Sequence, residues 1–276
     1  MVSVPERLLA LRHACTRGIP QRRASWLFRV SRSMLGYRHV MPLRRQPLVE
    51  HARSIIAGKP NWGCKLVREA LAVKGIQVGR HRFHRLWKAE KLQVSLRKSK
   101  KKIRTGKRLN PVPAAPNSVW CTDFAEDRAG GRKAFFLLVK DESTGFCLTC
   151  AARTSWKGVD VEAELERIAQ IHGYPKSIRS DNGGQYISFA VYRWASGHGV
   201  EQAFIDPGKP WQNGAAESLV ATLRRELLDI ECFATLEVAQ ILANRWRRIY
   251  NEERPHCRTK GRPPAPAYRQ AKAMTA

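Results

Sequence analysis

The sequence predicts two regions, a basic helical region followed by an α/β region that carries a five-stranded mixed sheet with flanking helices. Residues 1–116 hold 28 basic and 4 acidic residues, whereas residues 117–276 hold 22 and 19. Helical apolar periodicity dominates the first region. In the second, three consecutive strand-like runs precede alternating helices and strands, which is typical of a mixed sheet with helices packed on its faces.

The composition is that of a globular protein. Hydrophobic residues make up 43% of the chain, which includes eight Trp, nine Phe and six Tyr, so packed cores are expected. The longest apolar run, residues 134–139, is far shorter than the ~20 residues that cross a bilayer, and no secretory signal is visible. Seven scattered cysteines fit a reducing compartment. We therefore expect a cytoplasmic protein.

The net charge of +27 predicts a polyanionic partner. A charge of +24 within the first 116 residues exceeds what an ordinary solvated surface explains. Nucleic acid is the favoured partner, because Lys and Arg contacts to phosphates release condensed counterions. A membrane surface would require an apolar stripe opposite the basic residues. We expect DNA as the partner, no membrane, and association with the nucleoid.

Residues 20–37 have the pattern of a helix-turn-helix. Ala24, Leu27 and Phe28 form an apolar face, and Ser31 is the expected N-cap of the second helix. A helical hairpin without a DNA role is the alternative. The candidate DNA contacts are Arg32, Ser33 and Arg38.

Residues 48–94 predict three further helices, at 48–57, 64–74 and 80–90. The third helix has an apolar face opposite an arginine-rich face suited to a DNA groove or backbone. The alternative is a helical bundle with a basic surface. A basic, proline-rich linker follows at residues 97–116. The predicted DNA contacts are Arg80, Arg82, Arg85 and Lys88 in the third helix and Lys100, Lys101 and Lys102 in the linker.

The second region contains the pattern of the sheet. Expected strands cover residues 119–124, 133–140, 146–151, 177–180 and 200–204, and expected helices cover residues 159–172, 188–198 and 213–229.

Three acidic residues stand at the ends of these elements. Asp123 is expected to close the first strand, Asp181 follows the fourth, and Glu217 lies in the first turns of the last helix. Each has an ordinary explanation, as a strand end, a turn and a helix start. However, Glu217 is not in the capping-box position, which Ala216 occupies if Asn213 is the N-cap. Carboxylates from several elements can converge on one point, as magnesium requires.

A zinc site is the alternative use of the cysteines. Cys147 and Cys150 form one C-x-x-C, and His81 and His84 form one H-x-x-H. The pairs are 62 residues apart, and the cysteines lie in an apolar strand-like run. Because compact zinc spacing is absent, we expect no zinc.

Three segments resemble a known family: VWCTDF at 119–124, RSDNGGQY at 179–186 and PGKPWQNGAAES at 207–218. They are similar to the DDE catalytic core shared with retroviral integrases, and 35 residues separate Asp181 from Glu217, which is that family's interval. NEERPH at 251–256 also fits. The chain most resembles the second-frame product of transposases of the bacterial insertion sequence three family.

The resemblance implies an RNase H-like fold whose Asp123, Asp181 and Glu217 bind two Mg²⁺ or Mn²⁺ ions and catalyse DNA cleavage and strand transfer. It also implies a homo-oligomer on double-stranded DNA. Since the chain has no leucine heptads, a partner or fusion from the upstream frame is expected. Asn182, Gly183 and Gly184 would form a tight turn beside the metals. The further DNA contacts implied are Asn182, Gln212, Asn213 and Arg224.

The predicted domains are an N-terminal helix-turn-helix-like segment (1–45), a helical DNA-binding domain (46–96), the linker (97–116), the catalytic core (117–230) and a C-terminal helical extension (231–276). Two other functions remain open: a DNA-binding regulator with an idle RNase H-like domain, and a stand-alone nuclease.

Overall fold

The computed structural model describes residues 3–36, 41–94, 115–205 and 210–273. The chain forms two compact units, residues 1–51 and 52–276. None of the helices in the described ranges is both long and apolar enough to cross a membrane.

The first unit is a small helical cluster. It contains α1 (Val4–Thr16), α2 (Gln21–Phe28), α3 (Ser33–Gly36) and the start of α4 (Met41–Gly58), and its core includes Leu11 and Ala24. The expected helix, turn and helix are present as α2 and α3, but two details were wrong. Leu27 is 59% exposed and does not belong to the buried face. α3 starts at Ser33, so Ser31 does not precede it directly. Arg38 lies outside the described residues.

Three helices precede the linker. They are α4, α5 (Cys64–Val73) and α6 (Arg80–Ala89). The predicted second and third helices are confirmed to within one residue, whereas α4 begins seven residues before the predicted start. Phe83, Leu86 and Trp87 of α6 are buried, as the apolar pattern predicted.

The second unit contains the five-stranded mixed sheet. Its strands are β1 (Val119–Ala129), β2 (Arg132–Asp141), β3 (Cys147–Arg153), β4 (Ser177–Ser180) and β5 (Glu201–Phe204), in the order β3-β2-β1-β4-β5. β1, β2 and β3 are antiparallel neighbours, and β4 and β5 run parallel to β1. This arrangement confirms the predicted five-stranded mixed sheet.

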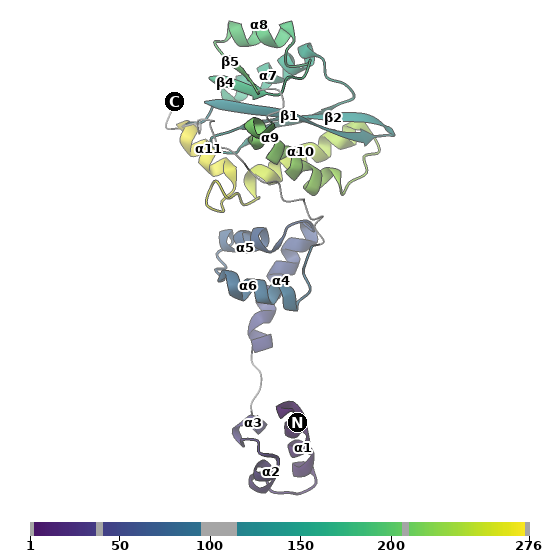
Figure 1. Cartoon of the computed structure of the whole chain (residues 1–276), viewed down its shortest axis with the longest axis vertical. Coiled ribbons are helices and arrows are strands. Elements are labelled where there is room, and N and C mark those ends of the chain that lie inside the picture. The colour runs from purple at the N-terminus through teal and green to yellow at the C-terminus, as the bar shows by residue number, and fades with distance from the viewer. Residues whose placement is uncertain (1–2, 37–40, 95–114, 206–209, 274–276) are drawn as a thin grey trace. The chain divides into compact units, whose positions relative to one another are not determined.

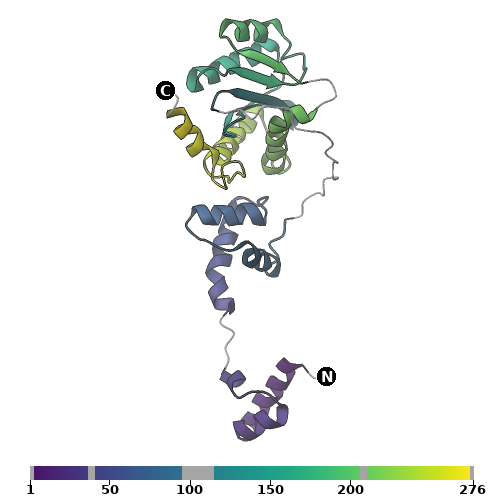
Figure 2. The same ribbon diagram turned by 60° about the vertical axis from the view of Figure 1, so that its left-hand side comes forward.

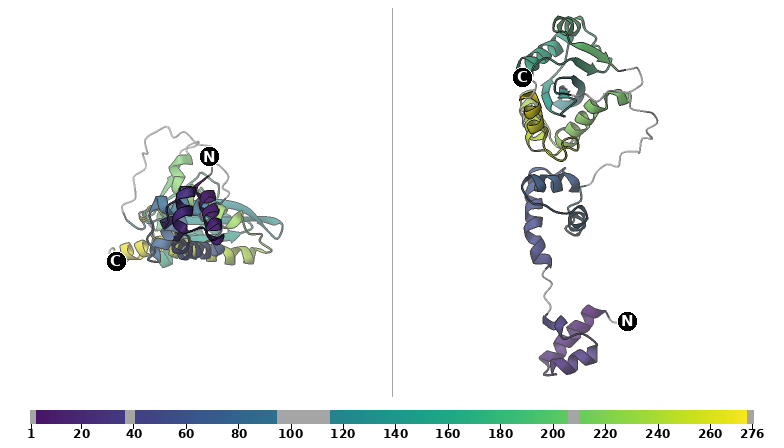
Figure 3. Two further views of the ribbon diagram at one scale, coloured as in Figure 1. Left: turned by 90° about the horizontal axis from the view of Figure 1, so that it is seen from below. Right: turned by 90° about the vertical axis from the view of Figure 1, so that its left-hand side faces the viewer.

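Helices cover both faces of the sheet (Figure 1), and views from other directions show the same layers (Figures 2 and 3). α7 (Gly158–His172) and α8 (Phe189–Gly197) pack on one face, together with Tyr268 of α11 (Pro264–Ala273). The other face carries α9 (Gly214–Leu223) and α10 (Leu236–Glu252).

The predicted helix at 213–229 is a composite. A 3₁₀ turn at Pro210–Asn213 precedes α9, and the π-helical segment η2 (Arg224–Leu228) follows it.

The C-terminal segment contributes to the core of the sheet. Ala243, Trp246 and Tyr250 of α10 belong to the same buried cluster as Phe136 of β2 and Leu219 of α9. α10 therefore packs as part of the core of the sheet. The domain boundary at residue 230 stays a prediction.

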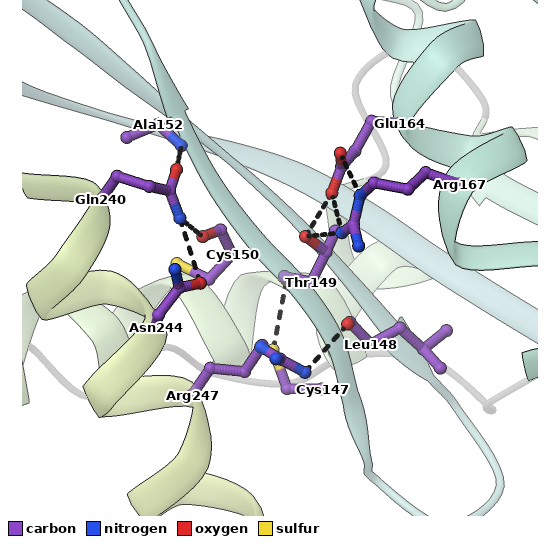
Figure 4. Close-up of polar contacts among 10 residues, drawn as sticks. All are labelled: Cys147, Leu148, Thr149, Cys150, Ala152, Glu164, Arg167, Gln240, Asn244 and Arg247. Atoms are coloured by element: carbon purple, nitrogen blue, oxygen red, sulfur yellow. Dashed lines mark hydrogen bonds and ion pairs between the residues drawn. The ribbon is translucent and has the colours of Figure 1, made fainter. Parts of the chain in front are cut away.

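Side chains of α10 satisfy the open edge of β3 (Figure 4). Gln240 accepts a 2.6 Å hydrogen bond from the amide of Ala152 and donates one of 3.2 Å to the carbonyl of Cys150. At the other end of the strand, Asn251 accepts from the amide of Cys147 and donates to its carbonyl, at 2.9 and 2.8 Å. An edge strand normally exposes such unpaired backbone groups. Here side chains of α10 supply the hydrogen bonds that a neighbouring strand would otherwise make.

Candidate active site

Asp123 lies in the middle of β1, not at its end as predicted. β1 continues to Ala129 because a hairpin at Gly130 and Gly131, both with positive φ, turns it directly into β2. Asp123 stands opposite Leu138 of β2. Its carboxylate is half-buried and accepts a 2.7 Å hydrogen bond from the amide of Phe124.

Asp181 follows β4 at the corresponding level of the sheet. β1 and β4 are parallel, and their last paired residues are Cys121 and Arg179, so Asp123 and Asp181 each lie two residues beyond that pair. The carboxyl ends of parallel strands are common positions for binding sites in α/β proteins. The carboxylate of Asp181 accepts a 3.1 Å hydrogen bond from the amide of Gly183.

Glu217 lies in the first turn of α9 and is exposed. The start of this helix is attached to β1 by Asn213, whose side-chain amide donates a 3.1 Å hydrogen bond to the backbone carbonyl of Thr122. Asn213 is 3% exposed, and its side-chain oxygen is buried without a hydrogen-bond partner among the described residues. In this structure Asn213 therefore anchors the helix beside Asp123.

The pKa of Asp123 reflects its burial and the negative charges of the other two carboxylates. The pKa of Asp123 is raised to about 6, chiefly by burial and further by the negative charges of Asp181 and Glu217, while the hydrogen bond from Phe124 opposes the rise. Repulsion between like charges that share a site is one of the recognised causes of such a shift. The carboxylates of Asp181 and Glu217 thus lie close enough to Asp123 to affect its ionisation.

The donor set fits a hard divalent cation. The site presents three carboxylates, and among the described residues neither Asp123 nor Asp181 forms an ion pair with a basic side chain. Such oxygen ligands suit Mg²⁺ and Mn²⁺. In the described ranges no three His, Cys, Asp or Glu side chains are grouped tightly enough to hold one ion as they stand.

The chain turns after Asp181, where the amide of Tyr186 donates a 2.9 Å hydrogen bond to the carbonyl of Gly183. Neither Gly183 nor Gly184 has a positive φ, so a left-handed turn is not the reason for them. At Gly183 the reason is space, since a Cβ there would lie 2.6 Å from Nε2 of Gln185 and 3.0 Å from Oδ1 of Asp181.

Sequence reasoning missed the support behind β1. Thr122 and Tyr186 are buried, and their hydroxyl groups are hydrogen-bonded to each other at 2.8 Å. This bond ties the loop after Asp181 to the strand that carries Asp123. The alternation of a strand could have placed Thr122 on the face opposite Asp123, but only the fold brings Tyr186 to it.

The predicted DNA contacts lie on several surfaces. Asn182 is exposed and donates a 3.0 Å hydrogen bond to the carbonyl of Ile205. Gln212 is half-buried. Arg224 is exposed and donates to the carbonyl of Glu126 at 3.3 Å. On α6, Arg80, Arg82, Arg85 and Lys88 are all exposed. Lys100, Lys101 and Lys102 lie outside the described residues.

The cysteine and histidine pairs differ in their environments. Cys147 and Cys150 are buried in β3, and burial raises the pKa of both thiols. His81 and His84 are exposed on α6.

Comparisons with known proteins agree with this geometry. Two family models, each described as an integrase core domain, match residues 113–210 and 198–264. The chain is 31% identical over 239 residues to the 31.7 kDa protein of insertion element IS407 of Burkholderia multivorans, covering 86% of each chain. It is 29% identical over 248 residues to the 39.2 kDa protein of insertion element IS476 of Xanthomonas euvesicatoria, covering 90% of this chain and 72% of that one.

Among solved structures, the magnesium-bound catalytic core domain of HTLV-2 integrase is similar at 16% identity, covering 55% of this chain and 95% of that one with a TM-score of 0.44. The two matched family ranges span the whole sheet, and between them they include all three carboxylates.

Proposed function

Because the chain belongs to the family of insertion-element DDE transposases with an integrase core domain, we propose that Asp123, Asp181 and Glu217 are its catalytic, metal-binding residues. As a family member the chain is a polynucleotidyl transferase that acts in transposition. The observation that carries the assignment of the site is geometric: Asp123 and Asp181 each lie two residues beyond the last pair of β1 and β4, and Asn213 fastens the start of α9, which carries Glu217, to the residue before Asp123.

In the proposed reaction, a water oxygen first attacks a phosphodiester at the end of the element and frees a 3′-hydroxyl. That hydroxyl then attacks a phosphodiester of the target DNA. Each step forms one P–O bond and breaks another, so the DNA is never joined to the protein. Two Mg²⁺ or Mn²⁺ ions, when bound, activate the attacking oxygen and stabilise the leaving one.

The residues of the chain supply the positions for this chemistry. Asp123 in β1 and Asp181 directly after β4 present oxygens from two adjacent parallel strands. Glu217 adds a third carboxylate from the first turn of α9. The exposed arginines of α6 and Arg224 are proposed to hold phosphates of duplex DNA. We further propose that the chain works in the nucleoid as a homo-oligomer on DNA, with an upstream-frame partner or fusion.

The test is strand transfer with duplexes that carry the candidate inverted-repeat ends, using the chain alone and fused to its upstream-frame product. Asp181→Ala should abolish Mg²⁺-dependent joining and leave DNA binding unchanged. Asp127→Asn is the matched control, since Asp127 is also on β1 and accepts a 2.8 Å hydrogen bond from the next amide; it should join strands as the wild type does. Joining by Asp181→Ala would refute the assignment, nicks alone would favour a nuclease, and an inactive wild type that binds DNA would favour a regulator.

A further inference from the structure

Lys140 is a lysine buried inside the core domain. It lies on β2 and is only 8% exposed. Alternate residues of a strand share a face, and Leu138, two residues earlier, belongs to the apolar cluster under α9 and α10. Burying an ammonium group is unfavourable unless hydrogen bonds or a counter-ion compensate it. Methionine would fill similar space without that penalty, so the amine calls for a specific explanation.

The Lys140 amine contacts the backbone of the helix that carries Glu217. Its Nζ donates a 3.2 Å hydrogen bond to the carbonyl of Ala215, in the first turn of α9. Within the described ranges no carboxylate forms an ion pair with it, and the acid nearby, Glu142, is bound to Arg179 at 2.7 Å. A cation near the start of a helix also opposes the helix dipole. The contact therefore forms despite two electrostatic penalties.

The other groups around the amine offer no alternative counter-charge. They are the thiol of Cys121 on β1, the thiol of Cys147 on β3, and the guanidinium of Arg258 and the imidazole of His256 in the loop before α11. An imidazole is neutral or cationic, so His256 supplies no negative charge. Burial raises the pKa of both thiols, which keeps them neutral, and Arg258 is itself cationic. The Ala215 carbonyl is thus the polar partner that the structure gives to Lys140.

Two side chains hold the start of α9 to the sheet. Asn213 bonds the backbone carbonyl of the residue before Asp123 on β1. Lys140 reaches Ala215 from β2, the strand next to β1 in the sheet. Since Glu217 follows Ala215 by two residues, these two hydrogen bonds set where its carboxylate stands relative to β1.

We propose that Lys140 is a positioning residue of the active site, which holds the first turn of α9 so that Glu217 can reach the metal held by the strand carboxylates. This inference rests on the proposed function of the three carboxylates. Removing a group that orients a metal ligand typically weakens metal affinity or activity by about 10–100-fold.

The test measures Mn²⁺ binding to the full chain without DNA, at pH 7.5. Electron paramagnetic resonance of the free and bound Mn²⁺ gives the affinity. Lys140→Met should weaken Mn²⁺ binding by about tenfold, while the melting temperature stays the same or rises, because a buried charge is removed. Lys140→Arg keeps a cationic donor and should restore most of the affinity. Lys133→Met is the control, since Lys133 is an exposed lysine of the same strand paired with Glu126, and it should bind as the wild type does.

A second background separates this inference from the function it rests on. Glu217→Gln alone should weaken Mn²⁺ binding; if it does not, the proposed metal site is wrong. If it does, Lys140→Met should cause no further loss in the Glu217→Gln background, because its effect passes through Glu217. An undiminished loss in that background, or wild-type affinity in Lys140→Met alone, would overturn the proposal. If Lys140→Met does not fold, Lys140→Leu gives the same comparison, because it also removes the donor to the Ala215 carbonyl.

Discussion

Replacing Asp123 by Asn should stabilise the metal-free protein at neutral and alkaline pH. The rise in the Asp123 pKa from 3.8 to about 6 corresponds to about 3 kcal/mol at ~1.4 kcal/mol for each pH unit. Partial exposure of the carboxylate reduces this to roughly 1–2 kcal/mol. A carboxyl whose pKa is raised by folding contributes stability below its unfolded pKa, and that stability is lost as the pH rises through about 6. Asparagine avoids the loss.

The assay is urea unfolding in EDTA at pH 8 and pH 4.5. Asp123→Asn should be more stable than the wild type by roughly 1–2 kcal/mol at pH 8, and the gain should fall to about a third of that at pH 4.5. Mg²⁺ should then stabilise the wild type more than the variant, because a ligand that binds only the native state favours it. Asp127→Asn removes a carboxylate from the same strand and should change little. A gain in Asp123→Asn that is equal at both pH values, or absent, would refute the reasoning.

Three further substitutions test other parts of the core domain. Asn251→Leu should lower the free energy of unfolding by about 2–4 kcal/mol in urea titrations, because it leaves the buried amide and carbonyl of Cys147 without partners; a change below about 0.5 kcal/mol would contradict the role given to this side chain. Gly183→Ala should displace the Asp181 carboxylate, since the added Cβ would lie 3.0 Å from its oxygen, and calorimetry should show weaker Mn²⁺ binding at a nearly unchanged melting temperature. Gly130→Ala should lower the melting temperature, because that residue has a φ of 56° and its Cβ would lie 2.9 Å from a backbone carbonyl oxygen; an unchanged value would mean that the hairpin can shift.

The sequence predicted the order of strands and helices well because the apolar pattern of this chain is locally strong. β4 has the predicted bounds, and α7 starts one residue before its predicted start. The length of β1 could not be read from the same pattern. The charged residues Glu126, Asp127 and Arg128 have the sequence pattern of a loop. They nevertheless pair with β2 across the hairpin at Gly130. Such pairing depends on two segments and cannot be read from the pattern of one.

The candidate site was predictable to a similar extent. Asp181 could be located from a turn sequence and Glu217 from a helix start. The 35 residues between them indicated that they belong to one site, because this is the interval of the family. What holds them could not be foreseen. Asn213 was expected to contact DNA, yet it is buried against Thr122. Nothing in the sequence marks Lys140, the last residue of a predicted strand, as buried, because its contact is with α9, which is distant in the sequence.

The hydrogen bonds between α10 and β3 also constrain how the chain can change in length. Gln240 and Asn251 are eleven residues apart in α10, a distance of about 16.5 Å at 1.5 Å per residue. Their partners Cys147 and Ala152 are five residues apart in β3, about 16.5 Å at 3.3 Å per residue. The helix and the strand are therefore matched in length at both ends. A single insertion in α10 would turn one amide away by about 100° and expose one end of the strand, so length changes in relatives should fall outside this interval.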